Sequence, residues 1–357
     1  MSVEVSNFGR TKDGGEIKLY TITNPGNTVL KLTDMGAVWV SMFVRDTDGR
    51  MDDVVLGLAS GEEYELRSFD AFGATVGRNA NRIFRHKFVL NGKEYDLADN
   101  DSGNNLHSGP DTYYTRLWES RTVRRPEGEG VEFSLFSPDK DQGMPGNLRI
   151  SVTYILTEDD SVIIEYRAVS DADTLFNMTN HSYFNLGGHN SGAVDGHEVQ
   201  INADKFTFGT DGRIADDELY SVEGTLLDFR QPKKLGDGMY SEDEFIKVKG
   251  GYDHNFCLAN GGGLMPAARI VEPNSGRVME ISTDMPGLQM YTGNYISTKN
   301  KGKDGATYYP YWGVAFETQH YPDAVNHPSF PSPVIRAGEE ILSRTVYHFD
   351  VLKESRV

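Results

Sequence analysis

The fold class of this chain is decided by residues 148–169, which read LRISVTYILTEDDSVIIEYRAV. In both halves of this segment apolar side chains recur at every second position, at Ile150, Val152, Tyr154 and Leu156, then at Val162, Ile164, Tyr166 and Ala168. A two-residue period places such side chains on one face of a β-strand. The pair Asp159-Asp160 between the halves supplies a turn. The segment therefore predicts a β-hairpin with one buried face.

A second hairpin is predicted at residues 87–97, where KFVL and KEYDL flank the dipeptide Asn91-Gly92. Asn-Gly readily adopts the positive φ angles of a type I′ turn, whose twist matches that of the flanking strands. Further strands are expected at residues 16–22, 28–32, 37–44, 131–136, 277–282, 314–317 and 341–349.

Helices contribute little to the predicted fold. No segment sustains a helical period with caps at both ends, and only residues 61–66 suggest a short helical turn. The 38 glycines and 14 prolines are scattered as punctuation between short strands, and no repeat of fixed period occurs. We therefore predict an all-β protein, a single large β-sandwich over residues 1–357, with two β domains as the alternative.

Composition argues against several classes of function. The 35 Lys and Arg against 53 Asp and Glu give a formal charge of −18, whereas a nucleic-acid binder normally needs a basic face. The one cysteine, Cys257, excludes an intrachain disulfide and a cysteine-rich metal site. The N-terminus has no signal-peptide pattern, and no apolar run is long enough to span a bilayer. We expect a cytoplasmic protein without nucleic-acid or membrane partners.

Six segments crowd polar, aromatic and glycine residues together, as binding loops at the rim of a sheet do. They are residues 73–83 (GATVGRNANRI), 104–109 (NNLHSG), 179–188 (TNHSYFNLGG), 252–256 (YDHNF), 282–295 (STDMPGLQMYTGNY) and 316–328 (FETQHYPDAVNHP). Their amide, carboxylate, Arg and His groups can hydrogen-bond hydroxyls, and their aromatic rings can cover the apolar face of a sugar. These residue types suit a neutral polyol.

The sequence lacks the motifs of several other chemistries. It has no GxGxxG after a strand, no Walker loop, no GxSxG elbow and no HExxH. The nine histidines include no helical i, i+4 pair, so we expect no metal, although a site assembled from separate loops would leave no local signature. A cofactor-free acid–base enzyme or a lectin-like binder remains.

In this order, the six segments resemble those of the aldose 1-epimerases, also called galactose mutarotases, and the similarity runs from about residue 15 to the C-terminus. The resemblance implies a galactose mutarotase-like supersandwich with an open cleft and no cofactor. It also implies interconversion of the α and β anomers of free aldohexoses such as D-glucose and D-galactose. We expect a monomer or a weak dimer.

The reaction needs one base and one acid. Opening a cyclic hemiacetal removes the proton of the C1 hydroxyl and protonates the ring oxygen; the aldehyde end then rotates and the steps reverse. A carboxylate and an imidazolium, which start in opposite protonation states, are a natural pair. By the resemblance, Glu317 in the FETQ segment is the base for the C1 hydroxyl, and His181 in the NHSYF segment is the acid for the ring oxygen.

The resemblance also implies residues that contact the sugar: Asn81, Arg82, His107, Tyr183, Asp253 and Gln289. We expect His107 to help polarise the ring oxygen, Arg82 to donate through its planar fork, and Asp253 to accept from hydroxyls. Four further motif residues are expected to support the site or be structural, namely Arg78, His254, His320 and His327. One departure is Ser108, which stands where many relatives have glycine, so the backbone shape of that loop is not fixed by the resemblance.

Three alternatives keep other functions open. A non-catalytic sugar-binding protein could use the same cleft residues without turnover. A hexose-6-phosphate 1-epimerase would need cationic groups for the phosphate, and the motif segments carry few extra Arg or Lys. A glycoside hydrolase usually needs two carboxylates flanking the scissile bond, whereas the best candidate pair here is a carboxylate and a histidine.

Overall fold

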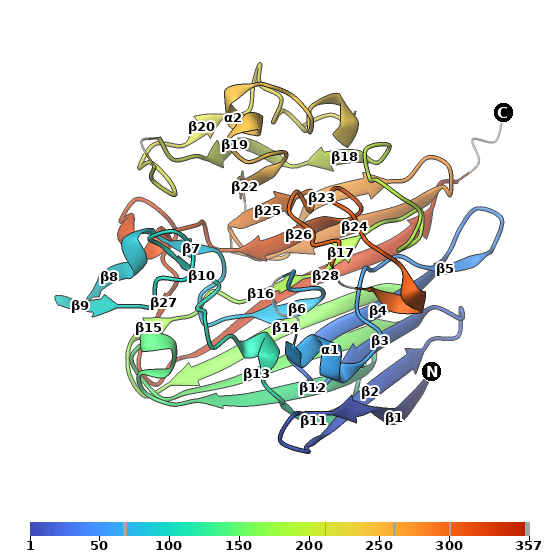
Figure 1. Cartoon of the computed structure of the whole chain (residues 1–357), viewed down its shortest axis with the longest axis horizontal. Helices are drawn as coiled ribbons and strands as arrows, with labels where there is room; N and C mark the ends of the chain where they lie inside the picture. The colour runs from blue at the N-terminus through green and yellow to red at the C-terminus, as the bar shows by residue number, and fades with distance from the viewer. Residues whose placement is uncertain (67–69, 211, 260–261, 300, 354–357) are drawn as a thin grey trace.

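The computed structural model describes residues 1–66, 70–210, 212–259, 262–299 and 301–353, and it is built mainly from three sheets (Figure 1). The N-terminal sheet has five strands in chain order, β1 (Ser2–Arg10), β2 (Glu16–Thr23), β3 (Val29–Thr33), β4 (Val38–Arg45) and β5 (Met51–Asp53). The largest sheet has nine strands in the order β11 (Glu119–Arg125), β12 (Gly128–Ser137), β13 (Leu148–Thr157), β14 (Ser161–Ser170), β28 (Glu340–Val351), β24 (Arg277–Thr283), β23 (Met265–Val271), β18 (Glu198–Ile201) and β21 (Lys233–Lys234).

The third sheet carries most of the polar motif residues. Its six strands run in the order β17 (Tyr183–Phe184), β26 (Val314–Gln319), β25 (Gly287–Tyr291), β22 (Asp253–Leu258), β19 (Ala203–Thr207) and β20 (Tyr220–Ser221). Short pairs complete the structure: β6 (Ala74–Val76) with β16 (Thr179–His181), β7 (Arg82–Ile83) with β10 (Asn105–Leu106), β8 (Lys87–Leu90) with β9 (Lys93–Asp96), and β15 (Thr174–Leu175) with β27 (Val334–Ile335).

Both predicted hairpins are confirmed. Strands β13 and β14 pair antiparallel with Val152 opposite Tyr166, and their inward side chains are buried. In the β8–β9 hairpin, Asn91 has φ 52° and Gly92 has φ 77°, as a type I′ turn requires. The other predicted strands correspond to β2, β3, β4, β12, β24, β26 and β28. The prediction misses several strands. One is β1, an edge strand that is largely exposed and has no buried face to impose an alternation; others, such as β18, β22 and β23, are missed although they carry buried residues.

Helices are short, as predicted. Residues 61–66 form α1 (Gly61–Leu66), and α2 (Glu244–Lys247) is a single turn capped by the side chain of Asp243, which accepts from the Phe245 amide. Within the described ranges, no helix has the length and apolar character that crossing a bilayer requires.

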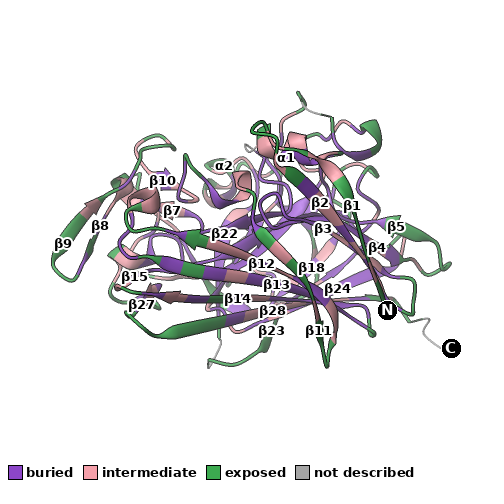
Figure 2. Cartoon of the chain, turned by 90° about the horizontal axis from the view of Figure 1, so that it is seen from below, coloured by how far each residue is buried: buried purple, intermediate pink, exposed green. Residues whose placement is uncertain are grey.

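The core is continuous through all three sheets. It runs from Tyr20 on β2 to Phe349 on β28, and Figure 2 shows buried residues through the middle of the sandwich, with exposed ones at the strand ends and turns. Trp39 on β4 is fully buried and meets Tyr154, Phe184, Tyr347 and Phe349 edge to face, at centroid distances from 5.5 to 6.5 Å. These rings come from β13, β17 and β28, so one side chain joins the three sheets.

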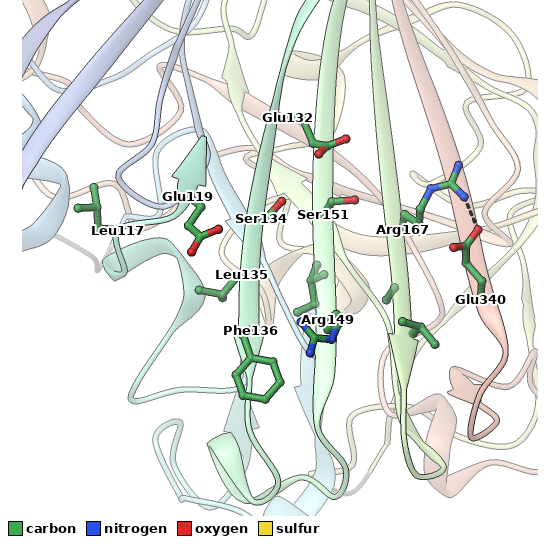
Figure 3. A pocket seen from close by; sticks show the side chains of 13 residues that line it. Leu117, Glu119, Glu132, Ser134, Leu135, Phe136, Arg149, Ser151, Arg167 and Glu340 are labelled. Atoms are coloured by element: carbon green, nitrogen blue, oxygen red, sulfur yellow. Dashed lines mark hydrogen bonds and ion pairs between the residues drawn. The ribbon is translucent and has the colours of Figure 1, made fainter. Parts of the chain in front are cut away.

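The outer face of the nine-stranded sheet has a hollow of about 600 Å³, seen in Figure 3. Its charged groups are mostly engaged with neighbours: Arg167 pairs with Glu340, and the Arg149 guanidinium lies 5.5 Å from the centroid of the Phe136 ring. None of the sugar-contacting residues expected from the sequence lines it. The hollow is therefore separate from the candidate functional site.

Candidate functional site

Strands β22, β25 and β26 alternate apolar and polar residues, and both of their faces are buried. On β26, Phe316 lies in the main core while Glu317 is on the opposite face; on β25, Leu288 and Met290 lie in the core on either side of Gln289. The sequence suggested binding loops at residues 252–256, 282–295 and 316–328, and this is partly wrong, because each contains a strand. Their polar residues face a buried cleft instead of solvent.

The strand register sets Glu317, Gln289 and Asn255 side by side. Gln289 is opposite Glu317 on β26 and opposite Asn255 on β22. In the neighbouring row, Tyr291 is opposite Asp253. Adjacent strands are about 4.8 Å apart, so the row from β26 to β22 spans about 10 Å of the sheet.

His181 reaches this row from β16, which pairs with β6 in the GATVGRNANRI segment. Its Nε2 lies 3.6 Å from Oε1 of Glu317, and both side chains are almost fully buried, at 7% and 3% exposure. The His181 ring is also tilted against that of Tyr183, with centroids 4.8 Å apart. A carboxyl group and an imidazole thus meet in a water-poor position, which suits proton exchange with one small group.

Asn81 and His107 hold each other through the β7–β10 pairing. The backbone amide of His107 donates to the Asn81 carbonyl at 3.0 Å, and the Asn81 amide donates to Nδ1 of His107 at 3.2 Å. Since Nδ1 accepts a bond, a neutral His107 carries its proton on Nε2. The ring stands edge-on to His181 with centroids 5.7 Å apart. His107 therefore offers a fixed N–H donor beside the catalytic candidates.

Ser108 adopts the conformation that the resemblance left unsettled. Its φ is 56°, in the left-handed region where glycine is usual. Its hydroxyl donates to the Asn79 carbonyl at 3.1 Å and accepts from the Asn79 amide at 2.9 Å. These two bonds tie the His107 loop to the segment that carries Asn81 and help offset the backbone strain.

A charged network lies at the β22 end of the row. Asp253 accepts from Nε2 of Gln289 at 2.6 Å, and its other carboxylate oxygen lies 4.0 Å from Nη1 of Arg82. Nε of Arg82 donates to Asp101 at 2.7 Å. The guanidinium is thus oriented by two carboxylates, and Arg82 lines the cleft. All eight residues named from the sequence are brought into one connected cluster.

Burial sets the protonation of the central pair. It raises the pKa of Glu317 well above its usual value, with the nearby Asp253 charge adding to the rise and Arg82 opposing it. Burial also lowers the pKa of His181 to about 4. Both directions place the shared proton on Glu317, which differs from the carboxylate–imidazolium start expected from sequence. The pair holds one proton in either arrangement, so these two states differ only by a proton transfer.

The two supporting charged groups behave differently. Burial lowers the pKa of His107 well below its usual value, and the His181 and Arg82 charges lower it further, so His107 stays a neutral donor. For Asp253, burial alone would raise the pKa, but the charges of Lys249 and Arg82 outweigh it and lower the pKa. Asp253 is therefore an ionised acceptor.

A metal would find few ligands here. Among the described residues, one group of potential ligand atoms comes within 4.8 Å of one another, on His107, His181 and Glu317. His107 has no lone pair to offer, because Nδ1 accepts from Asn81 and Nε2 carries the proton. The donor set fits hydrogen bonding to a substrate better than metal binding.

Sequence reasoning missed three residues of this site. Asn255 and Tyr291 face the cleft beside Gln289 and Asp253, and Lys249 lines the pocket at the β22 end with Arg82. The first two carried a signal, because the polar residues of YDHNF and LQMY fall at every second position, as they do along one face of a strand. Lys249 carried none, since it precedes the strand in a loop.

Comparison with known proteins agrees with this geometry. The profile of the family described as aldose 1-epimerase matches residues 18–348. The galactose mutarotase of Sus scrofa is 40% identical over 352 residues, 98% of this chain and 99% of the relative, and the aldose 1-epimerase of Escherichia coli (strain K12) is 39% identical over 342 residues, 94% and 96%. The crystal structure of galactose 1-epimerase from Lactobacillus acidophilus NCFM aligns with a TM-score of 0.87 and 28% identity, covering 99% of this chain and 100% of that one. The chain therefore belongs to the aldose 1-epimerase family.

Proposed function

We propose that the chain interconverts the α and β anomers of free aldohexoses such as D-glucose and D-galactose, with Glu317 as base and His181 as acid. The observation that carries this is the buried contact of 3.6 Å between His181 Nε2 and Glu317 Oε1. The two reacting oxygens of a hemiacetal, O1 and O5, are bonded to the same carbon. A base and an acid that serve them must therefore lie close together.

The cycle uses both proton arrangements of the pair. With Glu317 ionised and His181 protonated, Glu317 takes the O1 proton as His181 gives one to O5, and the C1–O5 bond breaks to leave the aldehyde. The C1 end rotates about the C1–C2 bond. Glu317, now protonated, returns a proton to O1 while His181 removes the O5 proton and the ring closes. The open-chain stage thus matches the neutral pair that burial favours.

Buried acceptors support a substrate rich in hydroxyl groups. Glu317 Oε2, Gln289 Oε1 and Asn255 Oδ1 are buried and have no hydrogen-bond partner in the described part of the chain. Leaving such an atom unpaired costs about 1–3 kcal/mol. A sugar lying across β26, β25 and β22 can donate to all three, while Asp253 accepts and Arg82 donates at the far end. His107 Nε2–H lies beside His181, where it can support the ring oxygen.

The alternative functions explain fewer features of the site. A glycoside hydrolase needs a second carboxylate across the scissile bond, and Asp253 is instead held by Gln289 two strands from Glu317. A silent sugar-binding protein would not require a buried acid–base pair. We further propose that residues 1–357 act as one domain, in the cytoplasm, as a monomer or weak dimer, without a cofactor, metal or nucleic acid; the continuous core supports the single domain.

Polarimetry on freshly dissolved α-D-glucose and α-D-galactose tests the proposed function. We expect the purified chain to speed the approach to anomeric equilibrium in proportion to its concentration. Heat-denatured protein in the same buffer is the control, because buffers catalyse mutarotation by themselves. A rate equal to the buffer rate for both sugars would rule out the proposed activity.

The pH profile of kcat/KM should be a broad plateau, because the pair is active only while it holds one proton. Below about pH 4 the rate should fall as His181 takes up a second proton and no base remains. On the alkaline side it should fall above the raised pKa of Glu317, where the proton is lost and no acid remains. The measurement is the initial optical rotation rate at each pH, extrapolated to zero buffer. An acid limb centred near pH 6.5, the usual pKa of His, would contradict a buried His181 in this role.

A further inference from the structure

Lys249 lies at the end of the cleft away from Glu317. It follows α2 and precedes β22, and its carbonyl accepts from Nδ2 of Asn294 at 3.0 Å and from the Tyr295 hydroxyl at 3.2 Å. Its half-buried side chain lines the same pocket as Arg82 and Asp253. The main chain of Lys249 is thus held in place while its side chain faces the cleft.

Lys249 lies farther from the described carboxylates than Arg82 does. Across the described residues, no carboxylate lies within 4.0 Å of its Nζ, whereas Arg82 lies 2.7 Å from Asp101 and 4.0 Å from Asp253. Lys249 is nevertheless near enough to lower the pKa of Asp253. On a chain with a formal charge of −18, which repels anions overall, this leaves one cation free to meet a negative group on a ligand.

Lys249 lies at the end of the cleft that would hold the part of the sugar remote from C1. If C1 lies beside Glu317 on β26, the opposite end of the sugar lies over β25 and points toward β22. The apolar residues that line the pocket there are Phe208, Ile214 and Pro322, and its cations are Lys249 and Arg82. A substituent at the end of the sugar remote from C1 therefore points toward the pocket that Lys249 lines.

We propose that Lys249 is a specificity-determining residue that lets this site take aldoses with an anionic group at the end remote from C1. The shared chemistry is a carboxylate, as in a hexuronic acid, or a phosphate ester. Of the two cations among the described residues that line this pocket, Arg82 is already paired with carboxylates, so Lys249 alone suits a singly charged carboxylate best. This inference rests on the proposed function, because it assumes that C1 sits at Glu317.

The test compares α-D-galactose, α-D-galacturonate and α-D-galactose 6-phosphate with the full-length chain and two variants. Lys249→Met keeps the length of the side chain without its charge. Lys247→Met is the matched control, because Lys247 on α2 is 64% exposed and pairs with Glu242 at 2.6 Å. We expect Lys249→Met to raise the KM for galacturonate about 3–10-fold more than the KM for galactose, because any effect through Asp253 acts on both sugars alike. Lys247→Met should leave the KM for both sugars unchanged.

The outcomes separate the alternatives. If Lys249→Met raises the KM for galacturonate alone, the recognised group is the carboxylate. If it also raises the KM for the phosphate ester, the site recognises either anionic group. Equal effects on galactose and galacturonate would show that Lys249 acts only through Asp253 and would overturn the proposal. If the wild type turns over no sugar, the proposed function fails, and calorimetric binding of galacturonate to the wild type and Lys249→Met then decides whether Lys249 binds the anion.

Discussion

Replacing Glu317 with Gln should lower kcat for galactose by about 10²–10⁴-fold, the usual contribution of a well-placed general base. Gln keeps the shape of Glu and one acceptor oxygen, but its amide cannot take the O1 proton. Sugar binding should change little, because Gln289, Asn255 and Asp253 stay in place. The readouts are kcat, from the rate of exchange between the α and β anomer signals in NMR, and the dissociation constant of the sugar, from calorimetry.

Two controls sharpen the Glu317→Gln result. Glu119→Gln removes an exposed carboxylate on β11 and should leave the rate unchanged. His181→Asn should cost about as much as Glu317→Gln, and the double variant should be no slower than the slower single one, because the two groups act as a unit. Additive losses, or a Glu317→Gln variant with wild-type kcat, would refute the assignment of base and acid.

Replacing Arg78 with Met should lower the free energy of unfolding by about 3–5 kcal/mol, a loss typical of a broken buried polar network. Arg78 is fully buried. Its guanidinium donates at 2.7–3.1 Å to six acceptors, the carbonyls of Ser137, Pro138, Pro145 and Gly146 and the hydroxyls of Ser137 and Thr174. Met fills much of the volume but removes every one of these donors, and each buried group left unpaired costs about 1–3 kcal/mol; the Pro138 carbonyl keeps a bond from the Asp141 amide.

Replacing Arg78 should also weaken the binding of galactose. Arg78 lies in the segment that carries Asn81 and Arg82, and its own carbonyl accepts from the Asn177 amide at 2.8 Å. We therefore expect the KM for galactose to rise at a temperature where the variant is still folded. Urea denaturation followed by tryptophan fluorescence measures the stability. Arg125→Met, at the exposed end of β11, should stay within about 0.5 kcal/mol of the wild type; an equally small change for Arg78→Met would contradict the network's role.

Much of the strand pattern could be predicted because one face of each predicted strand packs on the core. The β13–β14 hairpin shows this, since its inward positions are all apolar and the turn lies at polar residues. Local chemistry likewise fixed the β8–β9 turn through Asn91 and Gly92. Where no face is buried, as in β1, the pattern disappears and the prediction fails.

The site was only partly predictable. Glu317 and His181 could be named because their local motifs resemble those of a family. Their separation of 3.6 Å could not be predicted from the residues between them. The direction of their pKa shifts also depends on burial, which a motif does not contain. The role of Ser108 depended on a backbone angle and on its partner Asn79.

The sequence by itself determined the all-β class, the turn positions and most of the residues that could bind a sugar. Side-chain period, turn chemistry and motif identity are local properties. The tertiary structure alone decided which of these residues meet. The register of β26, β25 and β22 aligns Glu317, Gln289 and Asn255 in one row, and separate strand pairs bring His181 and His107 to it. Register and burial arise from contacts between segments distant in the chain, so the placement of the proton and the position of Lys249 beside the cleft become visible only in the folded molecule.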